Sequence, residues 1–104
     1  SILMKHPEIK AAAVTAVDDK LRGDEVFAFL MASEQTQEKA FEIVCWCLSK
    51  MAYYKAPGYI AFVEKIPLTS TQKIQRSNLK YLAKKRLKDN STIDTTHMKK
   101  RTST

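Results

Sequence analysis

The sequence predicts a small α+β domain, in which a three-stranded, mainly antiparallel sheet is flanked by helices. The chain has 104 residues, enough for one small domain. Hydrophobic residues make up 44% of it, so a core can form. Short apolar runs of strand length alternate with two longer stretches whose apolar residues recur every three or four positions. We therefore expect the order helix, strand, strand, helix, strand, loop and helix.

The N-terminal third predicts the end of a helix and two paired strands. Residues 1–5 are typical of a last helical turn, which His6-Pro7 ends because proline disfavours helix in the residue before it. Residues 10–17 and 25–32 are apolar runs of strand length. Residues 18–23 supply Asp and Gly for a turn between them, so we expect an antiparallel pair.

The clearest helix is predicted over residues 34–51, with Ser33 as its N-cap. Trp46 and Cys47 fall outside its main apolar stripe. The stripe follows three- and four-residue spacing and consists of Ala40, Phe41, Val44, Cys45, Leu48, Met51 and Ala52.

The C-terminal half predicts one more strand, a loop and a second helix. Residues 59–63 form a third apolar run, residues 67–72 a polar loop, and residues 77–88 a helix with leucines on one face. Residues 89–104 have little apolar content and are expected to be frayed or disordered. The expected organisation is a domain over residues 1–88 and a basic tail over residues 89–104.

Positive charge is concentrated at the C-terminal end. Residues 1–72 carry a net charge of −1 and residues 73–104 a net charge of +8. Such a segment could attract nucleic acid, an anionic membrane or a phosphate-rich small molecule, or be a solvated helix face followed by a soluble tail. Nucleic acid is not the expected partner, because Tyr81 is the one aromatic residue there on which a base could stack. No apolar run reaches the length of a membrane span.

Cysteine and histidine usage predicts neither a metal site nor acid–base chemistry. Cys45 and Cys47 have no second cysteine pair, and positions two apart on a helix face different ways, so neither zinc nor a disulfide is expected. Two reduced thiols fit a cytoplasmic protein. His6 is expected to end a helix and His97 to lie in the tail, without partners for general base catalysis. The chain begins at Ser1 rather than Met, which favours a piece of a longer protein.

Three stretches together resemble one family. They are His6-Pro7-Glu8-Ile9, then residues 52–57 (AYYKAP) followed by residues 59–63 (YIAFV), and then residues 66–76 (IPLTSTQKIQR). In this order and spacing they resemble the C-terminal domain of the AMP-forming acyl-CoA synthetases, within the adenylate-forming superfamily. The resemblance covers about residues 3–88. The chain departs from the family pattern at Gln72, where the family carries glycine.

The resemblance implies a two-step reaction and a catalytic role for Lys73. A carboxylic acid attacks ATP to give an acyl-adenylate, and CoA then takes the acyl group as a thioester. Lys73 matches the lysine that enters the cleft of a large N-terminal domain and stabilises the charge that develops on the phosphate. ATP and CoA are the implied substrates, with Mg²⁺ accompanying ATP and no tight ligand held by this chain alone. The isolated chain is therefore expected to be inactive.

Tyr54 and Lys55 match a region where some relatives contact CoA. Tyr54 keeps the aromatic residue that lies against the adenine, whereas Ala56 replaces a basic residue that meets a phosphate. Packing of Tyr54 at a helix end, with Lys55 reaching solvent, is an equally good interpretation. Two other functions stay open: a small basic nucleic-acid-binding module and a stand-alone interaction domain.

Overall fold

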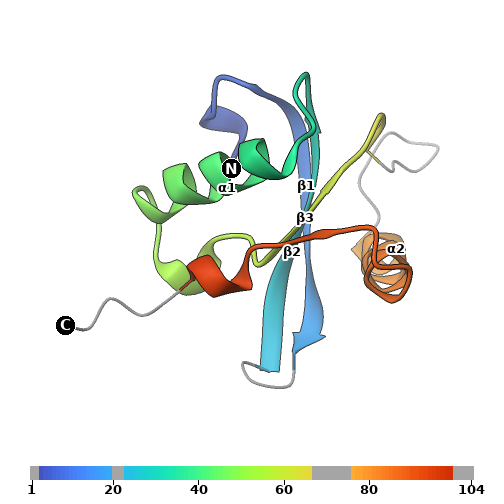
Figure 1. Cartoon of the computed structure of the whole chain (residues 1–104). Helices are drawn as coiled ribbons and strands as arrows, with labels where there is room; N and C mark the ends of the chain where they lie inside the picture. Colours follow the sequence, from blue (N-terminus) through green and yellow to red (C-terminus); the bar gives the residue numbers. More distant parts are fainter. Residues whose placement is uncertain (1–2, 20–22, 67–75, 100–104) are drawn as a thin grey trace.

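The computed structural model describes residues 3–19, 23–66 and 76–99, which form a four-stranded sheet with one α-helix on each face (Figure 1). The strands lie in the order β1-β2-β3-β4. Their bounds are β1 (Ile9–Asp19), β2 (Gly23–Ala32), β3 (Tyr59–Phe62) and β4 (Ile93–Asp94). The helices are α1 (Gln37–Leu48) and α2 (Arg76–Lys88), and the 3₁₀ turns are η1 (Leu3–Lys5), η2 (Tyr53–Lys55) and η3 (Thr96–Met98).

The α+β class is confirmed, but the sheet is mixed and has one strand more than the sequence predicts. Strands β1 and β2 are antiparallel, as expected, with Ala13 opposite Phe29. Strand β3 pairs in parallel with β2, and β4 is antiparallel to β3. The parallel pair arises because α1 crosses over the sheet between β2 and β3 and returns the chain to its starting end.

Strand β2 is buried on both faces, so it forms the centre of the molecule. Phe27 and Phe29 face α2, whereas Ala28 and Leu30 face α1. This alternation is the two-residue period of a strand. It divides the core into one cluster on each side of the sheet. The α1 side contains Leu3, Ile9, Ala28, Leu30, Ala40, Ile43, Val44, Cys47, Ala56 and Ile60, and the α2 side contains Ala13, Val17, Phe27, Phe29, Ala61, Leu79 and Ala83.

Helix α1 is shorter than predicted at both ends. It is capped by Thr36 rather than Ser33, because the Thr36 hydroxyl accepts the Lys39 amide at 3.0 Å. At the other end the Ser49 hydroxyl donates to the Trp46 carbonyl at 2.6 Å, and the helix stops at Leu48. Side-chain hydrogen bonds to the backbone therefore set both ends.

The predicted stripe of α1 is confirmed in part: Ala40 and Val44 are buried, and Leu48 and Met51 pack against the core. The buried stripe runs through Ala40, Ile43, Val44 and Cys47, whereas Cys45 is exposed. The prediction that Cys45 lies in the apolar stripe and Cys47 outside it was therefore wrong. Both sets of positions satisfy helical spacing, and the observed one places the branched side chain of Ile43 in the core.

The chain beyond Lys88 is ordered as far as Lys99, which corrects the expectation of disorder for this part of residues 89–104. Asn90, at a φ of 57°, turns the chain after α2 back toward the sheet. Strand β4 then adds to the edge of β3, and Thr95 and Lys99 are fully buried. The low apolar content predicted disorder here, but burial of these two polar residues attaches the segment to the fold.

Candidate functional site

Lys73 and the predicted loop over residues 67–72 lie outside the described residues, but the chain on both sides of them is anchored. Before the loop, Ile66 packs against the cluster on the α2 side of the sheet. After it, α2 begins at Arg76 and buries Leu79 and Ala83 in the same cluster. The segment that contains Lys73 therefore connects two points on one face of the sheet.

Tyr54 and Lys55 lie together on the exposed turn η2. Tyr54 is 61% exposed, and its ring meets the edge of Tyr53 at a centroid distance of 5.6 Å. Lys55 is also exposed, and its amide donates to the Ala52 carbonyl at 2.9 Å. The turn thus presents an aromatic ring and an ammonium group to solvent, which are suitable groups for a purine base and a phosphate.

Buried residues follow η2 directly and fix it to the fold. Ala56 is fully buried, and its amide donates to the Tyr53 carbonyl. Gly58 donates its amide to the Val26 carbonyl of β2 at 2.8 Å. A side chain at Gly58 would overlap the Glu25 side chain, which explains the glycine. The position of η2 is therefore determined by residues 56–58.

Lys99 and Glu25 form a buried ion pair that sequence reasoning missed. Their side chains are 0% and 1% exposed, and 74 residues separate them in the chain. A buried charge pair across such a separation has no periodicity or motif to reveal it. The surrounding apolar run of β2 was the one available signal, because a carboxylate at the start of a buried strand needs a partner.

A second ion network connects α1 to the segment before β1. The Lys39 ammonium donates to Glu8 Oε2 and to Glu42 Oε2, each at 2.5 Å. Hydrogen bonds to Glu42 and Glu8 raise the pKa of Lys39, and the bond to Lys39 lowers the pKa of Glu42. These side chains hold α1 to the start of β1.

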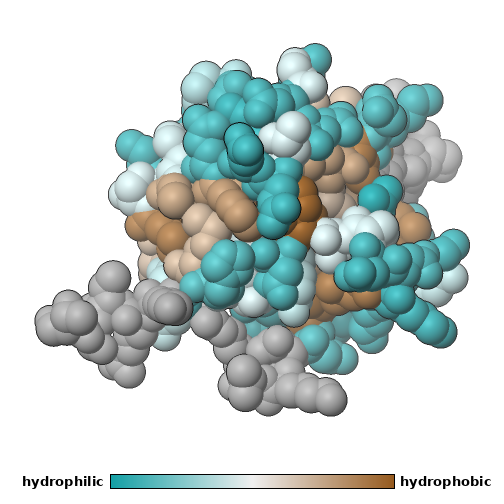
Figure 2. Space-filling model, in the orientation of Figure 1, coloured by the Kyte–Doolittle hydropathy of each residue, from teal (hydrophilic) through white to brown (hydrophobic). Residues whose placement is uncertain are grey.

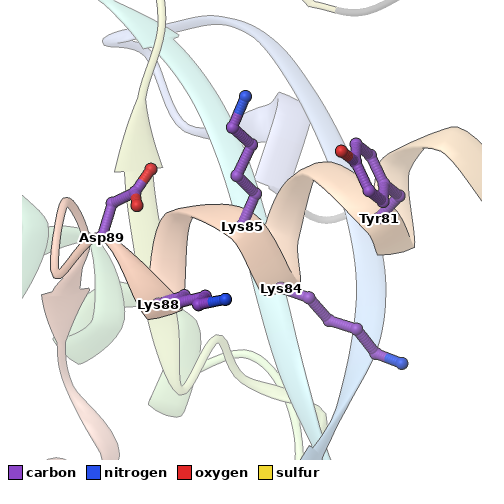
Figure 3. Close-up of a pocket in the computed structure, with 5 residues that line it drawn as sticks. All are labelled: Tyr81, Lys84, Lys85, Lys88 and Asp89. Carbon is purple, nitrogen blue, oxygen red and sulfur yellow. The ribbon is translucent and has the colours of Figure 1, made fainter.

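The exposed face of α2 forms an open, positively charged groove of about 470 Å³ (Figure 3). Tyr81, Lys84, Lys85, Lys88 and Asp89 line it. Figure 2 shows largely hydrophilic surface around α2, on the right of the view, and apolar surface on the left, toward the end of α1. The Lys84 ammonium is 4.0 Å from Asp18 Oδ2 on β1, which is a weak, solvent-exposed pair. The groove can attract phosphates without selecting one ligand.

The cysteines and histidines have structural surroundings. Both cysteines are free, and burial raises the pKa of the Cys47 thiol to about 11. His6 is buried, accepts the Glu8 amide on Nδ1 at 3.1 Å and lies edge-on to Trp46, while His97 lies edge-on to Phe41. Among the residues that the structure describes, no group of three or more potential ligands could hold a metal ion, and no helix is long and apolar enough to cross a membrane.

The curated relatives of this chain are named as CoA ligases, and the chain covers a small part of each of them. It is 41% identical over 85 residues to the mitochondrial medium-chain acyl-CoA ligase ACSF2 of Danio rerio, covering 82% of this chain and 14% of the relative. It is 31% identical over 85 residues to 2-succinylbenzoate–CoA ligase of Geobacillus kaustophilus, covering 82% of this chain and 17% of that protein. The chain thus spans about a seventh of the length of the first of these relatives.

Solved structures agree with this relationship. The acyl-CoA synthetase of Brucella canis superposes with a TM-score of 0.74 at 33% identity, over 82% of this chain and 16% of that one. The anthranilate CoA ligase AuaEII, in complex with anthranoyl-AMP, superposes with a TM-score of 0.68 at 37% identity, over 78% and 16%. The family described as AMP-binding enzyme C-terminal domain matches residues 1–73. The chain therefore belongs to the AMP-binding enzyme C-terminal domain family.

Proposed function

We propose that this chain is the C-terminal domain of an AMP-forming acyl-CoA synthetase and that Lys73 acts in its adenylation step. The observation that carries the proposal is the family match over residues 1–73, whose last residue is Lys73. The relatives named above, all of them acid–CoA ligases or synthetases, support the reaction class. The partner is the large N-terminal domain of the same protein, which binds ATP and the carboxylic acid.

Charge explains why adenylation requires a lysine. The carboxylate and the triphosphate are both anions, and negative charge increases on the α-phosphate as the new bond forms. A mobile ammonium group between them lowers this repulsion and stabilises the transition state. Mg²⁺ is expected with ATP, and because the described residues contain no metal-binding cluster, we assign no residue of this chain to it.

Tyr54 and Lys55 are proposed to act in the second step, when CoA enters. The exposed Tyr54 ring can stack on the adenine, and the Lys55 ammonium can meet a phosphate. Both groups are presented by one short turn, so they would contact adjoining parts of one nucleotide. We also propose a cytoplasmic location on the basis of two free thiols, although the ACSF2 relative is named mitochondrial.

The test is Lys73→Ala in the full-length enzyme. We expect acyl-adenylate formation, measured by ATP–pyrophosphate exchange, to fall on the order of 10²- to 10³-fold. Thioester formation from supplied acyl-adenylate should fall much less, since no phosphoryl group is transferred in that step. Lys73→Arg should restore activity only in part, because a planar guanidinium does not replace a point charge in a narrow cleft.

Lys65→Ala is a matched control, because Lys65 is an exposed lysine close in sequence on the other side of the loop. It should leave both half-reactions within about twofold, as expected for a surface substitution. Equal losses in both half-reactions for Lys73→Ala would indicate a folding defect and contradict the proposed role.

The groove on α2 supports an alternative function, a basic module that binds polyanions. Three lysines and Tyr81 surround it, and α2 contains no acidic residue. A gel-shift assay with single-stranded oligonucleotides at increasing salt would detect such binding, which should weaken steeply if it depends on phosphate contacts. A stand-alone interaction domain is the third candidate, and an open reading frame that lacks an upstream synthetase domain would favour it.

A further inference from the structure

Residues 93–99, here named the C-terminal clip, are attached to the backbone that follows η2. Strand β4 pairs Asp94 with Tyr59 and Ile93 with Ile60. Beyond it, the Thr95 amide donates to the Gly58 carbonyl at 2.9 Å, and the Thr95 hydroxyl donates to the Pro57 carbonyl at 2.8 Å. Thr95 is fully buried, so solvent does not compete for these bonds.

The ion pair of Lys99 with Glu25 connects the clip to β2. Glu25 Oε1 accepts the Lys99 ammonium and also the Val26 amide, the latter at 2.9 Å. The Glu25 side chain lies directly over Gly58, where any side chain would overlap it. Lys99 therefore holds the carboxylate that covers Gly58, and Thr95 binds the carbonyls of Pro57 and Gly58.

The clip also contacts helix α1. His97 lies edge-on to Phe41 of α1 at a centroid distance of 5.4 Å, and Met98 packs against the cluster on the α1 side. In Figure 1 the chain leaves α2, runs along the edge of the sheet through the clip and reaches η3, close to η2. These contacts attach the clip to α1 as well as to the backbone after η2.

Turn η2 presents its polar groups from a short segment of chain. It is three residues long, has no side-chain cap, and exposes Tyr54 and Lys55 to solvent. Its C-terminal end runs straight into Ala56, Pro57 and Gly58, which the clip and β2 hold. The direction in which η2 presents its ring and ammonium group therefore follows the backbone of residues 56–58, which the clip helps to hold.

We propose that Thr95 and Lys99 are positioning residues for CoA, which orient Tyr54 and Lys55 through residues 56–58. The family match ends at residue 73, so the clip is an addition to the part of the chain that defines the family. This inference rests on the proposed function, since it concerns the second half-reaction of the same enzyme. It predicts that loosening the clip weakens the use of CoA and spares adenylation.

The first experiment measures the turn itself and needs no activity. Hydrogen exchange of the 104-residue chain would be compared for Thr95→Val, which keeps the shape and loses the hydroxyl, and Thr95→Ser, which keeps the hydroxyl. We expect the amides of Ala56 and Gly58 to exchange at least tenfold faster in Thr95→Val and close to the native rate in Thr95→Ser. Thr15→Val, on β1, is the matched control and should leave them unchanged.

The ion pair is tested by removing one charge or both. Lys99→Met removes the ammonium group from the buried Glu25 carboxylate and can prevent folding. The double variant Glu25→Gln with Lys99→Met removes both charges of the pair, so it should fold and still show faster exchange at Gly58. Native exchange rates at Ala56 and Gly58 in both Thr95→Val and the double variant would overturn the inference.

The second experiment measures both half-reactions in the full-length enzyme. We expect Thr95→Val to raise the KM for CoA about tenfold, to leave ATP–pyrophosphate exchange within twofold, and Thr95→Ser to restore the KM. An unchanged KM, or equal losses in both half-reactions, would overturn the positioning role. Absence of CoA ligation by the unsubstituted enzyme would instead refute the proposed function, so the two failures are distinguishable.

Discussion

At the scale of single residues, the two cysteines show how one position on a helix determines reactivity. Cys47 is fully buried among apolar side chains, which raises the pKa of its thiol to about 11. Cys45, two positions away, is exposed. The thiolate is the nucleophile in alkylation, so burial lowers both the amount of the reactive form at Cys47 and its access to reagent.

We therefore expect iodoacetamide to modify Cys45 rapidly and Cys47 only on unfolding. Peptide mass spectrometry of the native chain at neutral pH should show at least tenfold faster labelling of Cys45. Labelling in denaturant, where the two thiols should react alike, is the control. Faster labelling of Cys47 would show that α1 presents the predicted stripe, with Cys45 inward, and equal rates would contradict the burial of Cys47.

Burial of Cys47 also predicts an alkaline loss of stability. Its pKa in the folded chain is about 11, above the ordinary value of 9.0, so the unfolded chain loses this proton first as pH rises. The stabilisation is complete below about pH 9 and is lost as pH approaches about 11. We expect this group to contribute on the order of 2 kcal/mol to the decline.

Urea unfolding between pH 8 and pH 11 would measure that contribution. Cys47→Ala should be less stable at pH 8, because it leaves a small cavity, but its stability should decline less with pH. Cys45→Ala, which changes the exposed thiol, should keep the native pH dependence. A Cys47→Ala curve parallel to the native one would refute the assignment.

At the scale of elements, the end of α2 decides where the C-terminal segment goes. The Ser91 amide donates to the Arg86 carbonyl at 3.0 Å, and the Asn90 amide donates to the Leu87 carbonyl at 3.1 Å. Asn90 has a φ of 57°, so these two hydrogen bonds form a Schellman motif at the end of α2. This turn reverses the chain after Lys88 and directs it toward β3.

Substitution of Asn90 tests this motif. Asn90→Gly should leave stability unchanged or raise it slightly, because glycine adopts a positive φ without a steric cost. Asn90→Val should lower the free energy of unfolding by about 1 to 2 kcal/mol, because a β-branched side chain clashes in this conformation. Chemical denaturation of the 104-residue chain would measure both, and equal stability of the two variants would contradict the motif.

At the scale of the whole molecule, the isolated chain is expected to bind ATP only weakly. The lysines of the groove on α2 are exposed, and the groove itself is open to solvent. Calorimetry should therefore detect weak ATP binding at about 50 mM salt and lose most of it by about 200 mM, as for exposed phosphate contacts. A variant with Lys84→Gln and Lys88→Gln should bind less at low salt.

Tight ATP binding that is insensitive to salt would contradict this expectation. It would show that the chain contains a complete nucleotide site without the large domain. Synthetase activity of the isolated chain would have the same meaning.

The local elements and the family were predictable from the sequence. Apolar runs of strand length located β1, β2 and β3, because their period and composition are local properties of the chain. Helical spacing located α1 and α2, apart from the caps of α1. The motifs that lead to Lys73 identified the family. Each motif is a continuous stretch of the chain, so no contact between distant residues is needed to recognise it.

Tertiary structure alone decided how β3 and β4 join the sheet, which of the two cysteines faces the core and what becomes of residues 89–99. The parallel pairing of β3 with β2 depends on where α1 packs, and the choice between Cys45 and Cys47 depends on the sheet beneath the helix. Strand β4 and the pair of Lys99 with Glu25 join residues far apart in the chain, whose polar side chains resemble those of a solvated tail. Their order comes from hydrogen bonds and charge pairing made inside the fold, which no local pattern in the sequence encodes.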